Sequence, residues 1–264
     1  MNILNEIYIN KKKEIKKDKD KCSLNTLEKI TKIIPNSGFR NLLISSNNSK
    51  KNNIIAEIKK SSPSAGTIIE NYDPIKIAQE YKKAGISALS ILTDKKYFEG
   101  NLEHITLVKK IIDIPILRKD FIIDPYQVIQ SKYYKADAIL IIMSILSTEQ
   151  AKEIINVATN YKIDCLIEVH NKKEINDALK LNSDIIGINN RNLDNLKVDL
   201  KNVNNLTNLI PDKYTIIAES GIKTKEDINE YNKLGIYNFL IGEKLLKSKN
   251  IKNTVNELIW KKIL

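Results

Sequence analysis

The stretch AILIIMSILSTEQAKEIINVATNYKIDCLIEV, residues 138–169, decides the fold class of this 264-residue chain. It joins the apolar run Ala138–Met143 to the apolar run Cys165–Val169 through the amphipathic segment Thr148–Tyr161. Ser147, with a glutamine three residues later, has the capping-box pattern of a helix start. Short runs that are apolar on both faces are typical of buried parallel strands. The stretch therefore predicts a strand–helix–strand unit.

The same alternation extends along the chain in both directions. The other predicted strands are Ile54–Ile58, Ala88–Leu92, Ile116–Lys119, Ile185–Ile188, Thr215–Glu219 and Phe239–Gly242. Further helices are predicted over Pro74–Ala84, Leu102–Ile112, Asn171–Leu181 and Thr224–Leu234. Alternation repeated about eight times indicates a parallel sheet covered by helices. The chain length, and the lack of a glycine-rich dinucleotide motif after the first strand, favour a (β/α)8 TIM barrel over an open doubly wound sheet.

The first 52 residues precede this alternation. Apolar residues recur there at helical spacing, at Ile3, Leu4, Ile7, Tyr8 and Ile15. A second helix is predicted over Leu24–Ile34. We expect residues 1–52 to form a helical extension packed on the barrel of residues 53–264, in one domain overall. The alternative is a disordered tail.

Composition limits the classes of function. Two cysteines far apart, Cys22 and Cys165, predict free thiols and no disulfide framework. The net charge of +11 raises nucleic-acid binding as an alternative, but the lysines are spread over the predicted helix faces, so no nucleic-acid partner is expected. No run approaches the ~20 apolar residues of a membrane span, and the N-terminus has no signal-peptide pattern. We therefore expect no membrane contact and a cytoplasmic location.

Charged residues end several predicted strands, where an unpaired charge would be costly. They are Glu57, Lys59, Lys119, Glu168 and Glu219. In a (β/α)8 barrel the C-terminal strand ends converge on the catalytic face. Alternate strand residues share a side, so Glu57 and Lys59 should face one pocket, although a structural ion pair at the barrel mouth is the alternative. Lysines and carboxylates gathered in a partly dry site predict acid–base catalysis without a metal.

Loops after other strands predict ligand contacts. Ser220 and Gly221 follow the seventh strand and Gly242 ends the eighth, at positions that often bind phosphate in this fold. The loop Ser61–Gly66 is a plain turn or a mobile active-site loop, and Asn189–Arg191 could grip a carboxylate or form a surface loop.

The two histidines receive little weight. His104 falls in a predicted helix, and His170 has no partner at metal-ligand spacing. We therefore expect no metal site.

Seven segments, in this order, carry a resemblance to the indole-3-glycerol-phosphate synthase family. They are IAEIKKSSPS (55–64), LTDKKYFEG (92–100), PILRKDFI (115–122), LIEVH (166–170), GINNRNL (187–193), AESGI (218–222) and IGE (241–243). The resemblance implies closure of the indole ring of 1-(2-carboxyphenylamino)-1-deoxyribulose 5-phosphate, with loss of CO₂ and water, in tryptophan biosynthesis. It implies no cofactor and no metal, and a monomer that could contact other enzymes of the pathway.

The resemblance also implies roles for individual residues. Lys119 would be the general acid that activates the substrate carbonyl, and Glu168 the general base for dehydration. Lys59 would hold the substrate carboxylate and help protonate a leaving oxygen, while Glu57 orients Lys59 or takes part in proton transfer. The other substrate-binding residues would be Ser62, Phe98, Phe121, Asn189, Arg191 and Glu219. The phosphate would lie at Ser220, Gly221, Gly242 and Glu243, the last through its backbone.

Lys244 stands where small residues are commoner in the family, which leaves the side chains around the phosphate open.

Two other functions remain to be compared. A phosphoribosylanthranilate isomerase would be expected to use a cysteine–aspartate pair, but no cysteine ends the first strand. A non-catalytic basic binding protein would leave the charges at the strand ends without a role.

Overall fold

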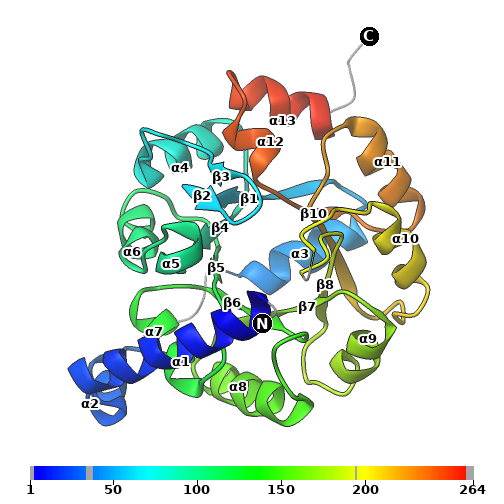
Figure 1. The fold of residues 1–264 in the computed structure, drawn as a ribbon. Helices are drawn as coiled ribbons and strands as arrows, with labels where there is room; N and C mark the ends of the chain where they lie inside the picture. Colours follow the sequence, from blue (N-terminus) through cyan, green and yellow to red (C-terminus); the bar gives the residue numbers. More distant parts are fainter. Residues whose placement is uncertain (1–2, 34–37, 194, 260–264) are drawn as a thin grey trace.

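Eight parallel strands close into a barrel within residues 3–33, 38–193 and 195–259, the part of the chain that the computed structural model describes (Figure 1). Their order around the barrel is β1-β10-β9-β8-β7-β6-β5-β4. The bounds are β1 Asn53–Ile58, β4 Ala88–Leu92, β5 Ile116–Lys119, β6 Ala138–Ile142, β7 Asp164–Val169, β8 Ile185–Asn189, β9 Thr215–Glu219 and β10 Asn238–Ile241. Two short strands, β2 Ser61–Ser62 and β3 Gly66–Thr67, pair outside the barrel.

The strand predictions are confirmed, with ends that shift by no more than one residue. One of these shifts affects the site, because Gly242 does not end a strand but caps the short helix that follows β10. The parallel register places Glu57 beside Ser90, Ile142 beside Glu168, and Asn189 beside Glu219. The charged strand ends are thereby brought to one mouth of the barrel.

Helices surround the barrel. Their bounds are α1 Ile3–Lys21, α2 Leu24–Ile30, α3 Phe39–Asn48, α4 Pro74–Lys83, α5 Lys95–Phe98, α6 Glu103–Lys109, α7 Pro125–Tyr133, α8 Thr148–Asn160, α9 Lys172–Ala178, α10 Lys201–Thr207, α11 Lys225–Lys233, α12 Glu243–Leu246 and α13 Ile251–Ile259. The predicted helices are present, and Ser147 and Gln150 form the expected capping box of α8. The periodicity did not reveal α7, because this helix buries the polar residues Gln127, Gln130 and Lys132 and has no simple apolar stripe.

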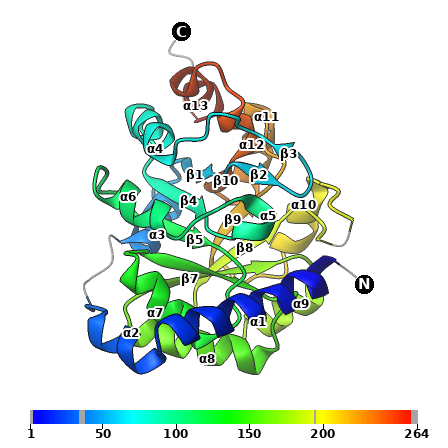
Figure 2. The same cartoon turned by 60° about the vertical axis from the view of Figure 1, so that its left-hand side comes forward.

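Of the N-terminal helices, α1 and α2 contact α7, whereas α3 packs directly against β9 and β10 (Figure 2). Lys11 of α1 is buried, and its Nζ lies 2.6 Å from Asp94 Oδ2 and 2.9 Å from Asp120 Oδ1. Asp94 follows β4 and caps α5, and Asp120 follows Lys119 directly. These buried ion pairs connect the N-terminal helix to the two loops that border the mouth. The predicted second helix, Leu24–Ile34, is shorter in the structure: α2 ends at Ile30 because the backbone turns extended at Thr31, and Ile34 lies outside the described residues.

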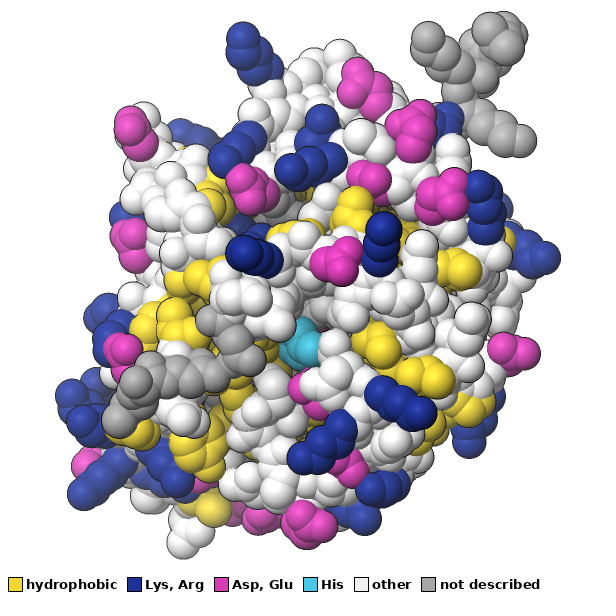
Figure 3. Space-filling model, turned by 45° about the vertical axis from the view of Figure 1, so that its right-hand side comes forward, with side chains coloured by type: hydrophobic (Ala, Val, Ile, Leu, Met, Phe, Trp, Pro, Cys, Tyr) yellow, Lys and Arg dark blue, Asp and Glu magenta, His cyan; other side chains and the backbone are white. Residues whose placement is uncertain are grey.

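The chain carries no apolar helix of membrane-spanning length among its described residues. Figure 3 shows one face of the molecule, on which lysine and arginine side chains are interspersed with aspartate and glutamate. The lysines on this face therefore do not form one continuous basic stripe.

Candidate active site

A cavity of about 840 Å³ opens at the C-terminal ends of the barrel strands. The charged strand-end residues line it together, from four strands or their continuations: Glu57 and Lys59 from β1, Lys119 from β5, Glu168 from β7 and Glu219 from β9. Apolar residues such as Leu140, Ile142 and Leu240 form its floor. Charges in a partly dry cavity interact more strongly than charges in water, so their arrangement decides which groups hold protons.

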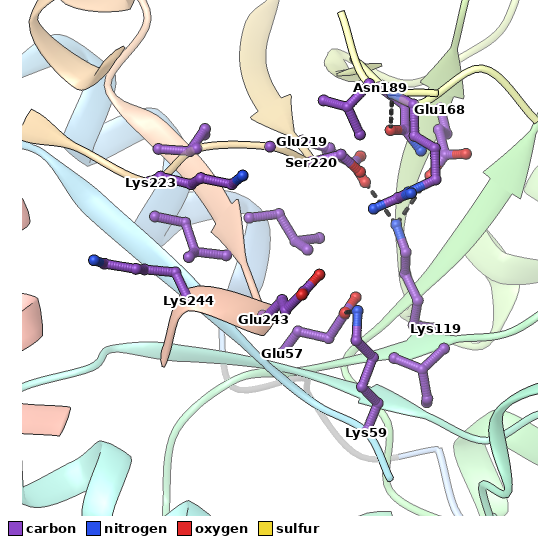
Figure 4. Close-up of a pocket in the computed structure, with 18 of the residues that line it drawn as sticks. Glu57, Lys59, Lys119, Glu168, Asn189, Glu219, Ser220, Lys223, Glu243 and Lys244 are labelled. Atoms are coloured by element: carbon purple, nitrogen blue, oxygen red, sulfur yellow. Dashed lines mark hydrogen bonds and ion pairs between the residues drawn. The ribbon is translucent and has the colours of Figure 1, made fainter. Parts of the chain in front are cut away.

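Lys119 lies at the centre of this arrangement (Figure 4). Its Nζ donates to Glu168 Oε2 at 2.9 Å and to Glu219 Oε2 at 2.6 Å. Burial opposes the positive charge, but the carboxylates of Glu168, Glu219 and Glu57 outweigh it and raise the pKa of Lys119 above its ordinary value. Lys119 is therefore a cation that two glutamates aim into the cavity.

The two glutamates around Lys119 differ in their affinity for a proton. Burial raises the pKa of Glu168, yet Lys119 and the neighbouring His170 outweigh it and bring that pKa below its ordinary value. Burial raises the pKa of Glu219 to about 7. The Lys119 ammonium offsets only part of the effect of burial, and the Glu168 carboxylate raises this pKa further. Titratable groups whose environments separate their pKa values mark acid and base roles. Glu168 is therefore the more acidic of the two, and Glu219 takes up a proton more readily near neutral pH.

Glu57 and Lys59 form a second ion pair in the cavity. Lys59 Nζ lies 2.5 Å from Glu57 Oε1, and both side chains are largely buried. Strand alternation places them on the same side, as expected from their spacing in the sequence. The Lys59 ammonium faces the same space as Lys119 (Figure 4). The mouth thus offers two cations to an anionic ligand.

Two glycines make room for these carboxylates. A Cβ at Gly187 would lie 2.1 Å from Glu219 Oε1, and a Cβ at Gly242 would lie 2.6 Å from Glu57 Oε1. Either contact is far shorter than non-bonded atoms allow. A side chain at either position would force the neighbouring carboxylate to shift, so glycine preserves the observed positions of Glu219 and Glu57.

Gly187→Ala is expected to lower kcat/KM by about tenfold or more. The added methyl would displace Glu219 and, through it, Lys119. A displacement of catalytic groups by about 1 Å is enough for such a loss. Overpacking should also cost about 1–3 kcal/mol of the free energy of unfolding. Product formation and chemical denaturation would be measured on the same preparation. Wild-type activity in this variant would show that the position of Glu219 does not matter for turnover.

Aromatic and polar side chains border the rest of the cavity. Phe98 and Phe121 line it with ring centroids 6.3 Å apart. Asn189 Oδ1 accepts the backbone N–H of Arg191 at 2.9 Å, and the Arg191 guanidinium donates to the Leu196 carbonyl at 2.9 Å. The arginine is therefore held by its own loop at the rim, and its remaining N–H groups can serve a ligand.

The expected phosphate end gathers residues from the loops after β9 and β10. Ser220, Gly221, Gly242 and Glu243 all line the cavity there. Ser220 and Gly221 have positive φ values of 66° and 83°, which turn consecutive backbone N–H groups along this loop. Lysines that were not singled out as site residues also line this end: Lys223 and Lys244, which Figure 4 labels, and Lys247. Their excess positive charge suits a phosphate dianion.

Ser62 is the one expected site residue that does not line the cavity. It lies in β2, where its hydroxyl accepts the backbone N–H of Ala65 at 3.2 Å. The serine stabilises the hairpin after β1, a contact that the loop sequence does not reveal.

His170, to which the sequence analysis assigned no role, lies beside the charged strand ends. It lies against Glu168, with Nε2 3.3 Å from Oε1. The alternation that joins Glu57 to Lys59 also joins Glu168 to His170, two residues further along, so the signal was present in the sequence. Among the described residues, no cluster of three or more His, Cys, Asp or Glu side chains could hold a metal ion.

The family model and the relatives that are most similar in sequence agree on one family. The family model described as indole-3-glycerol phosphate synthase matches residues 4–258. The enzyme of that name from Acetivibrio thermocellus is 42% identical over 258 residues, covering 97% of this chain and 98% of the relative. The one from Caldanaerobacter subterraneus subsp. tengcongensis is 43% identical over 245 residues, covering 93% of each. A solved 3-hexulose-6-phosphate synthase has a TM-score of 0.60 at 13% identity, covering 78% of this chain and 97% of that one, which shows the fold alone.

Proposed function

The chain belongs to the indole-3-glycerol phosphate synthase family, and from this premise we propose how its barrel mouth closes the indole ring in tryptophan biosynthesis. The substrate would be 1-(2-carboxyphenylamino)-1-deoxyribulose 5-phosphate, and the products indole-3-glycerol phosphate, CO₂ and water. The observation that carries the assignment is a buried lysine whose ammonium donates to two buried glutamates, in a cavity that has a cationic end.

Ring closure needs an acid at the substrate ketone. The aromatic carbon that bears the carboxylate attacks the ketone carbon, and the ketone oxygen gains negative charge as the new bond forms. Lys119 would stabilise that charge and donate the proton that makes the oxygen a hydroxyl. Its contacts with Glu168 and Glu219 aim the ammonium toward the centre of the cavity. Phe98 and Phe121 would support the aromatic ring during the attack.

Decarboxylation then restores the aromatic ring without a cofactor. Lys59 would hold the carboxylate before it leaves as CO₂, and Glu57 would orient Lys59 through their 2.5 Å contact. The hydroxyl made in the first step must leave as water, so it needs a second proton. Lys59 would supply that proton, and Glu168 would take the proton whose loss completes the indole double bond.

The phosphate would lie at the other end of the cavity. Backbone groups of Ser220, Gly221, Gly242 and Glu243 line that end, with Lys223 and Lys244 beside them. Anchoring the phosphate and the carboxylate at opposite ends holds the ketone near Lys119. Binding of such remote groups can contribute several kcal/mol toward positioning.

All these side chains come from one chain, so we propose that a monomer is sufficient for activity. Loss of specific activity on dilution would contradict this proposal.

The purified protein is expected to form a fluorescent indole product from the carboxyphenylamino-deoxyribulose phosphate, with one CO₂ per indole and without added metal. Absence of product with this substrate would overturn the proposed function. The isomerase alternative would instead consume phosphoribosylanthranilate. It is disfavoured because Cys165 is buried within β7, and burial raises the pKa of its thiol.

A further inference from the structure

His170 connects the proposed base to a charged group outside the cavity lining. Nε2 lies 3.3 Å from Glu168 Oε1, within ion-pair distance but outside hydrogen-bond geometry. On the other side of the ring, Nδ1 lies 3.1 Å from Glu174 Oε2, which also accepts the His170 backbone N–H at 2.8 Å. Only 11% of the histidine side chain is exposed. The ring is thus enclosed between two carboxylates.

The other groups around this histidine do not disfavour a positive charge on its ring. Asn202 of α10 contacts His170 only through a neutral amide, which donates to its backbone carbonyl at 3.3 Å. Lys119 of β5 reaches the other oxygen of Glu168, and Glu219 of β9 reaches Lys119. Burial disfavours an imidazolium, but Glu168 and Glu174 outweigh it and raise the pKa of His170 to about 10. Glu168 therefore has one cation at each oxygen.

We propose that His170, held as an imidazolium between Glu168 and Glu174, is a positioning residue that keeps Glu168 ionised and oriented when Lys119 turns to the substrate. The proposal rests on the base role assigned to Glu168 under the proposed function. In the free protein one lysine lies between Glu168 and Glu219, and it binds both. Once Lys119 protonates the ketone, it no longer balances the charge of Glu168, and a second cation beside Glu168 then favours its ionised form. His170 contacts Glu168, so its charge favours the ionised form of that glutamate.

Glu174 has a defined part in this arrangement. It lies in the first turn of α9, where its backbone N–H donates to the Asn171 side chain that caps the helix. Its side chain is fixed by the Asn171 amide and by the His170 backbone. The carboxylate is therefore positioned before the substrate arrives and can balance the imidazolium charge.

The first test observes the charge directly and does not depend on turnover. The chain has two histidines, so imidazole signals in a heteronuclear NMR titration are assigned by comparison with His104→Asn. His170 is expected to stay protonated up to about pH 10, whereas burial lowers the pKa of His104, which serves as the internal control. In Glu174→Gln the His170 midpoint should fall. A neutral His170 at pH 7.5 in the wild-type protein would overturn the inference.

The second test uses the pH profile of turnover in His170→Gln. An opposite charge within ~4–6 Å lowers a carboxyl pKa by about 1–3 units, so removing it raises the pKa of Glu168. The acid limb of kcat should therefore move to higher pH by about one unit or more, while the rate at the optimum falls less. Equal loss at every pH would indicate a purely structural role and overturn the inference. Failure of the wild-type protein to make indole would overturn the proposed function, whereas a neutral His170 in an active enzyme overturns this inference alone.

Discussion

Lys119→Met is expected to lower kcat/KM by about 10³-fold, the largest single effect in the chain. The variant keeps an unbranched side chain but removes the proton donor and the charge that stabilises the forming alkoxide. General acids contribute about 10²–10⁴-fold and oxyanion donors about 10²–10³-fold. The variant loses both contributions, because the same ammonium donates the proton and stabilises the alkoxide. Indole fluorescence over a range of substrate concentrations gives the measurement.

The matched control is Lys76→Met, which removes an exposed lysine from α4, outside the cavity lining. This control should keep wild-type kcat/KM, so a loss confined to Lys119→Met reports on the site. Unfolding must be recorded for both variants, because Glu168 and Glu219 lose their shared cation without Lys119. A folded Lys119→Met protein with near wild-type turnover would contradict the acid assignment.

Glu168→Gln should give the second largest effect, a fall in kcat of about 10²–10³-fold with little change in KM. The amide can still accept from Lys119, so ground-state contacts largely persist while the base is lost. A change confined to kcat indicates that the interaction is made in the transition state. Steady-state kinetics at saturating substrate would show this separation.

Glu219→Gln is the comparison that makes this result specific. Glu219 holds a proton near neutral pH, and an amide resembles a protonated carboxyl in shape and charge. The loss in Glu219→Gln should therefore be clearly smaller than in Glu168→Gln at pH 7. If the two losses were equal, or reversed in order, Glu168 would not be the base.

The fold of this protein could be predicted from short stretches of sequence, because the patterns that specify its strands and helices are local. A parallel strand buried on both faces must be apolar, and a covering helix needs an apolar stripe and a cap; both patterns can be read within about ten residues. Ile116–Lys119 and Thr215–Glu219 were predicted with their actual ends for this reason. Closure of a barrel then brings the strand ends to one mouth, so the gathering of the charges followed from the fold.

Only the tertiary structure decided which glutamates of the site are ionised and how much space their side chains have. The ionisation of Glu168 and Glu219 depends on distances to Lys119 and His170, across residues far apart in the chain, and on burial. The need for glycine at Gly187 depends on a carboxylate from a neighbouring strand. The place of Ser62 outside the cavity lining was likewise not evident, because its loop sequence suits both a turn and a ligand contact. Coulomb energies and van der Waals contacts depend on positions in space, which a linear pattern does not specify.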